Sequence, residues 1–132
     1  MSRYFIDLTQ PEIAAQLRKN PLVILPAGSV EQHGPHLPTG TDIYASNVIG
    51  HAVAERMDGL VLRGGPLGVT PMHMPFEGTI TLTPETYQRV VVETCESTAK
   101  HGAKRLLILN WHEGNIPSLA IASEKLHRDV GM

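Results

Sequence analysis

The amino-acid sequence predicts a three-layer α/β/α protein with a mostly parallel β-sheet. Segments with helical and strand-like patterns alternate along the chain, which is the order expected of a parallel sheet with helices on both faces. Residues 22–25 and 106–109 are continuous apolar runs, which are typical of strands buried on both faces. The chain has 132 residues and lacks repeats and linkers, so we expect residues 1–132 to form a single α/β domain.

The first half of the chain contains two predicted helices around a strand. Residues 11–19 carry apolar side chains at helical spacing, with Thr9 as a plausible N-cap. The strand at 22–25 follows and is expected to end at a proline. Residues 42–59 form the second predicted helix, with Gly59 as its stop. Its core-facing positions are expected to be those that follow a 3.6-residue period, namely Ile43, Val48, Ile49, Ala52 and Val53.

The second half continues in the same order. We predict a strand at residues 60–65, a short extended piece at 79–82 and a helix at 84–102. A strand at 106–109 and a final helix at 116–130 follow. Thr83 can cap the third helix, and Pro84 suits its first position. The apolar side of the final helix is expected to comprise Ile116, Leu119, Ala120, Ile121 and Leu126. This side and the strand at 106–109 both require neighbours that cover them.

Composition excludes several classes of protein. The net charge of -2 argues against nucleic acid or an anionic membrane as a partner. No stretch approaches the roughly 20 apolar residues of a membrane span. The first ten residues lack the apolar region of a signal peptide. The single cysteine, Cys95, suits a reducing compartment and is expected to lie in the core. We therefore expect a cytoplasmic protein.

Two polar clusters follow the two apolar strands. Glu31, His33, His36 and Asp42 lie within a dozen residues after the strand at 22–25, and His112 and Glu113 follow the strand at 106–109. Because ligands of open parallel sheets collect at the carboxyl ends of the strands, both clusters should lie on one rim. The alternative is a polar surface loop that happens to be rich in histidine, but this does not explain why such residues follow a strand twice.

These side chains suit a divalent metal. Glu31 and His33 are two positions apart, so in an extended segment they point to the same side. Asp42 is expected at the start of a helix, and His112 follows the strand at 106–109. Carboxylates with imidazoles favour zinc, with manganese or iron as other candidates. A carboxylate shared between two ions could activate water near neutral pH. No fixed short zinc motif is present, so spacing alone is only moderately specific.

Three segments carry a resemblance to a known family. LPAGSVEQHGPHLPTGTD, FEGTITLTPET and ILNWHEGN are similar, in this order, to the hallmark segments of the creatininase family, across most of residues 22–115. The resemblance implies a metal-dependent amidohydrolase that opens cyclic amides or removes formyl groups from small molecules, often as a higher oligomer. It also implies the creatininase-like α/β/α fold.

The resemblance implies roles for individual residues. Glu31 and His33 would each bind one of two metal ions, Asp42 would bridge them, and His112 would complete the site. His36 corresponds to a second family histidine and would be either a weaker ligand or a supporting residue.

The sequence departs from the family pattern in two ways. Creatininase has a glutamate ligand two positions after the last histidine, where this chain has Gly114; the acid is at Glu113 instead, as general base or replacement ligand. The chain is also roughly half the usual family length. We therefore expect a fragment, a processed half or one subunit of a split enzyme, completed by a second polypeptide within a homo- or hetero-oligomer.

Other residues have weaker interpretations. The resemblance places His73 close to the pocket, although plain packing explains His73 equally well. Trp111 replaces the family's usual glycine before the histidine and would shape the substrate wall. His51, His101 and His127 are expected to be surface or satisfied core residues. The rival functions are a non-catalytic metal-binding or scaffold subunit and, less favoured, a nucleotide-binding regulatory domain. Against the latter, the glycines at 64–65 lack dinucleotide-binding spacing.

Overall fold

The computed structural model describes residues 2–65 and 67–132. The helices are α1 (Gln10–Lys19), α2 (Thr41–Met57), α3 (Pro84–Lys100) and α4 (Ile116–Val130). The strands are β1 (Leu22–Ala27), β2 (Leu60–Val61) and β3 (Arg105–Asn110). The described residues also form the 3₁₀ turns η1 (Phe5–Asp7), η2 (Pro71–His73) and η3 (Glu113–Asn115). The predicted alternation of helices and strands is confirmed.

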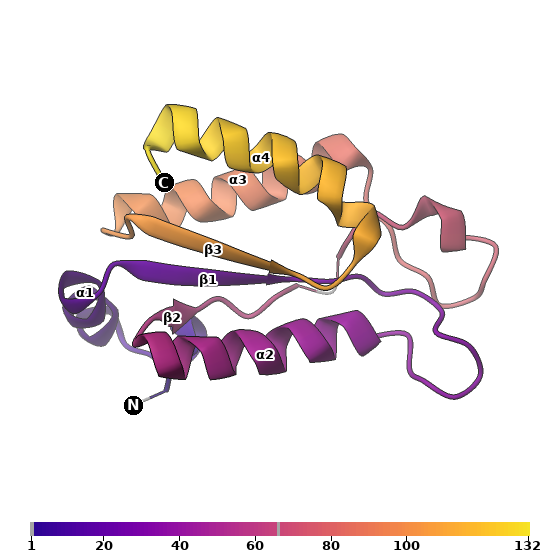
Figure 1. Cartoon of the computed structure of the whole chain (residues 1–132), viewed down its shortest axis with the longest axis horizontal. Helices are drawn as coiled ribbons and strands as arrows, with labels where there is room; N and C mark the ends of the chain where they lie inside the picture. Colours follow the sequence, from indigo (N-terminus) through magenta and orange to yellow (C-terminus); the bar gives the residue numbers. More distant parts are fainter. Residues whose placement is uncertain (1, 66) are drawn as a thin grey trace.

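The strands form one parallel sheet in the order β2-β1-β3. β1 is central and pairs with β3 from Leu22–Arg105 to Ala27–Asn110. Helix α2 covers one face of the sheet, and α3 and α4 lie together on the other face (Figure 1). The structure thus confirms the three-layer α/β/α architecture. The ends of β1 and β3 point the same way, so the segments that follow them meet at one edge of the molecule (Figure 1).

The helix starts follow the predicted capping chemistry. The carboxylate of Glu12 accepts a hydrogen bond from the backbone N–H of Thr9 at 2.8 Å, which completes a capping box at α1. Thr83 Oγ1 accepts from the backbone N–H of Thr86 at 3.3 Å at the start of α3. Helix α2 ends slightly before the expected stop at Gly59, because Asp58 already adopts the left-handed conformation, with φ of 53°.

The expected core face of α2 is partly wrong: Ile43, Ile49, Ala52 and Val53 are only partly buried. The structure buries Asp42, Ser46, Gly50 and Ala54, whereas Val48 is 68% exposed. The reason is the close approach of the helix to β1. A Cβ atom on Gly50 would lie 2.9 Å from Cγ of Pro26, so only small side chains fit between helix and sheet. This arrangement brings the start of α2, and Asp42 with it, against the end of β1.

The extended segments also differ in extent from the expected ones. β1 continues through Pro26 to Ala27. β2 is much shorter than residues 60–65, because the backbone N–H of Gly64 donates to the side chain of Asn47 at 3.0 Å instead of joining the sheet. The extended piece at 79–82 forms only isolated bridges, in which Ile80 pairs with Val30 and Thr81 with Gly68. These bridges tie the long connection before α3 to the segment after β1.

Apolar packing is uneven across the molecule. Cys95 is fully buried in the core between the sheet, α3 and α4, as expected. Within the described residues β3 has one strand neighbour, and Leu106–Leu109 are only half-buried. The expected face of α4 is partly wrong: Leu119 and Leu126 are buried, but Ile116 and Ile121 are more than half exposed. None of the described helices is long and apolar enough to cross a membrane.

Candidate metal centre

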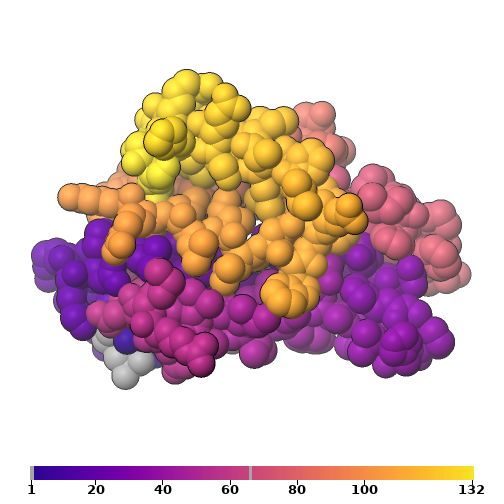
Figure 2. All heavy atoms as spheres, in the orientation of Figure 1, coloured from indigo at the N-terminus to yellow at the C-terminus, as the bar shows by residue number. Residues whose placement is uncertain are grey.

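The two predicted polar clusters meet beyond the carboxyl ends of β1 and β3. Glu31 lies in the segment after β1, Asp42 lies in the first turn of α2, and His112 follows β3. All three are more than 90% buried, and each offers one ligand atom within 4.8 Å of the others. In the space-filling view, residues around 30–45 and around 70–80 form the end of the molecule on this side (Figure 2).

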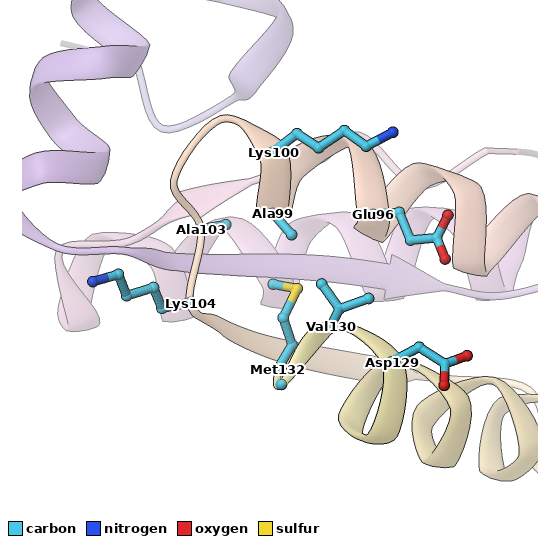
Figure 3. Close-up of a pocket in the computed structure, with 9 residues that line it drawn as sticks. Glu96, Ala99, Lys100, Ala103, Lys104, Asp129, Val130 and Met132 are labelled. Atoms are coloured by element: carbon cyan, nitrogen blue, oxygen red, sulfur yellow. The ribbon is translucent and has the colours of Figure 1, made fainter.

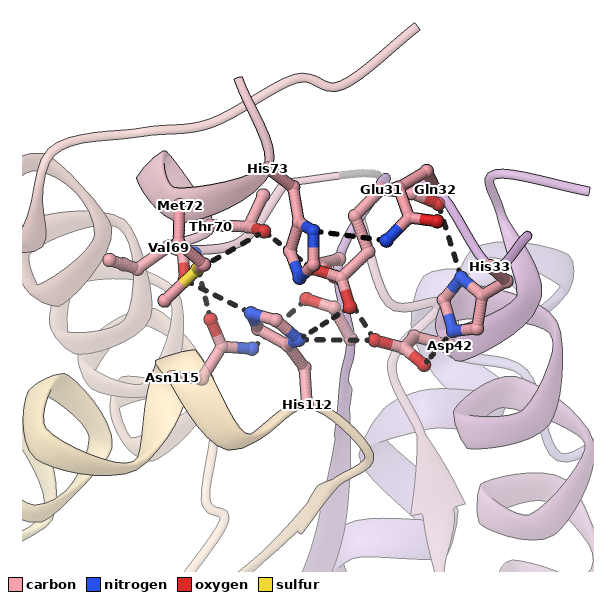
Figure 4. A network of polar contacts seen from close by, with 12 residues as sticks. Glu31, Gln32, His33, Asp42, Val69, Thr70, Met72, His73, His112 and Asn115 are labelled. Carbon is pink, nitrogen blue, oxygen red and sulfur yellow. Dashed lines mark hydrogen bonds and ion pairs between the residues drawn. The ribbon is translucent and has the colours of Figure 1, made fainter. Parts of the chain in front are cut away.

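His112 directs an unprotonated nitrogen at two carboxylates. Its Nε2 lies 3.0 Å from the carbonyl oxygen of Val69, which can only accept a hydrogen bond, so Nε2 carries the proton of the neutral ring. Its Nδ1 lies 3.2 Å from Oε1 of Glu31 and 3.3 Å from Oδ2 of Asp42 (Figure 4). A lone pair facing two carboxylate oxygens is stabilised when a metal cation lies between them or when the ring is protonated. We name this place, bounded by these three ligand atoms, the inner position.

His33 repeats this arrangement on the other oxygen of Asp42. Its Nδ1 lies 3.1 Å from the carbonyl oxygen of Glu31, so Nδ1–H is the donor, and Nε2 lies 3.1 Å from Oδ1 of Asp42. We name the place between Nε2 of His33 and Oδ1 of Asp42 the outer position. Asp42 therefore presents one oxygen to each position, as a bridging carboxylate must.

Several buried polar residues hold the ligands in place. Ser29 Oγ donates to Oδ2 of Asp42 at 3.0 Å, and Thr70 Oγ1 donates to Oε2 of Glu31. Asn115 donates to the carbonyl of Gly28 at 3.0 Å and accepts from the backbone N–H of Val69 at 2.9 Å. It thereby joins the segments after β1 and β2 to η3. Such partners orient metal ligands and raise their affinity.

Sequence reasoning missed these supporting residues. Ser29 and Thr70 belong to the commonest polar types, and no spacing rule distinguishes them. Asn115 lies within ILNWHEGN, the segment that carries the family resemblance, so a signal for it was present.

The remaining predicted residues surround the group of three ligands. His73 is half-buried, and its Nε2 lies 3.7 Å from Oε2 of Glu31. His36 and Glu113 are exposed and do not belong to the group. Trp111 is 48% exposed, and its backbone N–H donates to the carbonyl of Ala27 at 2.8 Å. The structure thus brings together Glu31, Asp42 and His112, places His33 and His73 beside them, and leaves the other three at the surface.

Gly114 lies in a position that admits no side chain. A Cβ atom there would overlap the carbonyl oxygen of Val69 and would lie 2.5 Å from Nε2 of His112. The contact between these two residues fixes the tautomer of His112, so glycine at 114 is part of the ligand geometry. A carboxylate ligand from this position would need a different backbone path through η3.

A surface cavity lies away from this cluster. It has a volume of about 730 Å³ and is bounded by the C-terminal ends of α3 and α4 (Figure 3). Lys100, Lys104, Asp129 and Met132 are among its lining residues. Because the amino end of β3 follows α3, this cavity lies at the opposite end of the sheet from the ligands. It contributes nothing to the metal centre.

Comparison with known proteins gives consistent matches. A family model described as creatinine amidohydrolase matches residues 6–132. The chain is 37% identical over 123 residues to a mycofactocin precursor peptide peptidase of Mycobacterium ulcerans, covering 84% of this chain and 49% of that protein. It is 32% identical over 115 residues to a creatinine amidohydrolase of Pseudomonas putida, covering 83% and 44%.

Solved structures agree with the sequence matches. A crystal structure of creatininase superimposes with a TM-score of 0.92 at 28% identity, covering 98% of this chain and 52% of that one. A structure described as creatininase Mn superimposes with a TM-score of 0.87 at 29% identity, covering 100% and 55%. A mutant creatininase described as Zn-Zn type also matches, with a TM-score of 0.92 at 28% identity, covering 99% and 53%. The chain spans about half the length of the curated relatives that it matches.

Proposed function

The chain belongs to the creatininase family, and we propose that it forms the metal-binding half of an amidohydrolase. The proposed reaction is hydrolysis of a C–N bond in a cyclic amide or formamide-type small molecule. The observation that carries this proposal is the division of Asp42 between two histidines, with Oδ2 toward His112 and Oδ1 toward His33. A buried carboxylate with an imidazole lone pair facing each oxygen is an arrangement suited to two cations.

The proposed cofactor is a pair of divalent ions, zinc with manganese or iron as alternatives. Imidazole nitrogens and carboxylate oxygens are ligands that these metals share. The relatives described as Zn-Zn type and as creatininase Mn support both choices. The two positions differ, because the inner one has three buried donors from this chain and the outer one has two. We therefore expect the inner position to bind its ion more tightly.

The chemistry of the site divides between the metal and the chain. Bound divalent metal polarises an amide carbonyl and makes water nucleophilic near neutral pH. Glu31, Asp42 and His112 hold the inner position, and the bond from His112 to the Val69 carbonyl keeps the ring in the tautomer that exposes Nδ1. His33 and Asp42 hold the outer position. Glu113, next to His112 on the exposed side, is proposed either as the general base or as an additional ligand.

A second polypeptide is proposed to complete the site. The half-buried Leu106–Leu109 segment of β3 and the exposed Ile116 and Ile121 of α4 are apolar surfaces suited to a covering chain. Such a chain would extend the sheet, supply a further metal carboxylate and build the substrate pocket within a larger oligomer. A cytoplasmic location is proposed as well, supported by the single, buried cysteine.

A non-catalytic metal-binding or scaffold subunit is the alternative function. It is favoured by one observation: Gly114 provides no carboxylate, so this chain gives the outer position only His33 and Asp42. In this case the partner chain would carry the chemistry.

Metal analysis combined with turnover tests the proposal. The purified protein, with any second polypeptide that copurifies, is assayed for metal content and for hydrolysis of a panel of cyclic amides and N-formyl compounds. We expect up to two ions per complete site and hydrolysis that a chelator abolishes and added zinc or manganese restores. Stoichiometric metal without hydrolysis of any member of the panel would favour a non-catalytic metal-binding subunit. Absence of stoichiometric metal would refute the amidohydrolase and favour a scaffold subunit.

A further inference from the structure

A chain of polar contacts outside the ligand group fixes the orientation of His73. The backbone N–H of Gly34 donates to Oε1 of Gln32 at 2.9 Å, which assigns the oxygen and nitrogen of that amide. Nε2 of Gln32 therefore faces Nδ1 of His73, at 3.2 Å, and donates a hydrogen bond to it (Figure 4). Because Nδ1 accepts this bond, the proton of the neutral ring is on Nε2.

The protonated side of His73 faces Glu31. Its Nε2 lies 3.7 Å from Oε2 of Glu31, which also accepts a hydrogen bond from Thr70 Oγ1. Both donors thus face the same oxygen. The other oxygen, Oε1, faces Nδ1 of His112 in the inner position. The carboxylate is consequently divided into one oxygen that faces protein donors and one that faces the metal position.

The loop that carries His73 is held in place by its own hydrogen bonds. The backbone N–H of His73 donates to the carbonyl of Thr70 at 3.1 Å, in the turn η2. Its carbonyl accepts from Thr79 Oγ1 at 2.8 Å and from the backbone N–H of Phe76 at 2.9 Å. The ring of Phe76 lies 6.3 Å from the imidazole, centroid to centroid. The position of His73 is therefore set before any ligand arrives.

We propose that His73 is a positioning residue that holds Glu31 as a single-oxygen metal ligand, with Gln32 selecting the tautomer that does so. The inference rests on the proposed metal centre but concerns a residue outside it. Without the N–H group of His73, which lies 3.7 Å from Oε2, that oxygen would keep only the hydrogen bond from Thr70 Oγ1, and the carboxylate could rotate or bind through both oxygens. Outer partners of this kind typically contribute about 10- to 100-fold to metal affinity.

The test compares variants that keep or remove the donor at the place of Nε2. His73→Gln keeps an N–H group close to that place, whereas His73→Phe keeps a ring and removes the donor. Gln32→Met removes the group that selects the tautomer and leaves His73 itself intact. Zinc affinity is measured on the purified protein by competition with a chromophoric chelator, and thermal unfolding in excess chelator reports the stability of the metal-free fold.

We expect zinc affinity to fall about tenfold or more in His73→Phe and to stay within about threefold of wild type in His73→Gln. Gln32→Met should also lower zinc affinity. If His73→Phe does not fold, the zinc affinity of Gln32→Met tests the proposal instead. A role in packing alone would lower the unfolding temperature in chelator without separating the Gln and Phe variants. Equal affinities in those two variants, or an unchanged affinity in Gln32→Met, would overturn the proposal.

The outcome also separates this inference from the one on which it rests. Wild-type protein that binds no zinc would refute the metal centre and the role of His73 together. Wild-type protein that binds zinc, with affinity unaffected by these substitutions, would refute the role of His73 alone.

Discussion

His33 Nε2 lies 3.1 Å from Oδ1 of Asp42, and in the neutral tautomer neither atom carries a proton. Two acceptors at this distance repel each other unless a cation lies between them or the ring is charged. Asp42 repeats the situation with His112 through its other oxygen. The carboxylate of Asp42 is thus the group common to both proposed metal positions.

Replacing Asp42 should therefore remove metal more completely than replacing His36. We expect Asp42→Ala to lose nearly all bound metal and His36→Ala to keep most of it, because His36 is exposed and outside the ligand group. Metal content by mass spectrometry measures this, with Asp42→Asn as the variant that keeps the side-chain shape. Unchanged metal in the Asp42→Ala variant would rule out two ions sharing this residue.

Glu113→Gln should lower turnover without unfolding the protein. The substitution keeps shape and removes both basicity and negative charge, and general base catalysis is typically worth about 10²- to 10⁴-fold. Circular dichroism checks the fold, and metal content distinguishes the two proposed roles: unchanged metal indicates a base, reduced metal a ligand. Turnover within a few-fold of wild type would make Glu113 a bystander and would point to a carboxylate from the second polypeptide.

Gly114→Ala should destabilise the protein and weaken metal binding at the same time. The new Cβ would overlap the Val69 carbonyl and push against His112, and overpacking of this kind costs about 1–3 kcal/mol. Urea unfolding and zinc competition measure the two effects. Gly65→Ala is the matched control, because a Cβ there meets nothing within 4 Å. Similar behaviour of the two variants would contradict the tight packing at 114.

Cys95 should resist thiol reagents in the folded protein. Burial raises its pKa to about 12, so at pH 8 only about one thiol in 10⁴ is ionised. We expect slow labelling at pH 8 and rapid labelling in urea. The same shift favours the neutral thiol in the folded state, so its contribution to stability is full below about pH 9 and is lost as pH rises toward 12. Fast labelling without denaturant would show that the core around α3 opens readily.

The purified chain should not behave as a free 14.4 kDa monomer. β3 presents half-buried leucines at a sheet edge, and α4 exposes Ile116 and Ile121. Light scattering or sedimentation would then report a larger species, or aggregation that a second polypeptide prevents. A stable, metal-loaded and active monomer would refute the proposed assembly.

Patterns of residue type and spacing predicted the layer order and the convergence of Glu31, Asp42 and His112. Continuous apolar strands and capped helices are local signals, and the carboxyl ends of parallel strands meet by topology alone. The core face of α2 was not predictable in this way, because apolar periodicity selected Val48, whereas close packing against Pro26 selects small residues. Ser29 and Thr70 were missed for a related reason: their roles depend on neighbours distant in sequence, not on their own type.

The position of β1 between β2 and β3 has a consequence for synthesis. As the nascent chain leaves the ribosome, β1 emerges about 80 residues before β3. The edge of β1 that pairs with β3 therefore stays unpaired until the longest loop in the sheet has closed. Glu31 and Asp42 emerge early as well, but His112 and Asn115 emerge only after β3. A divalent ion could therefore meet the two carboxylates without the imidazole of His112 during translation, and selective binding would begin only once residues 105–115 had folded back against β1.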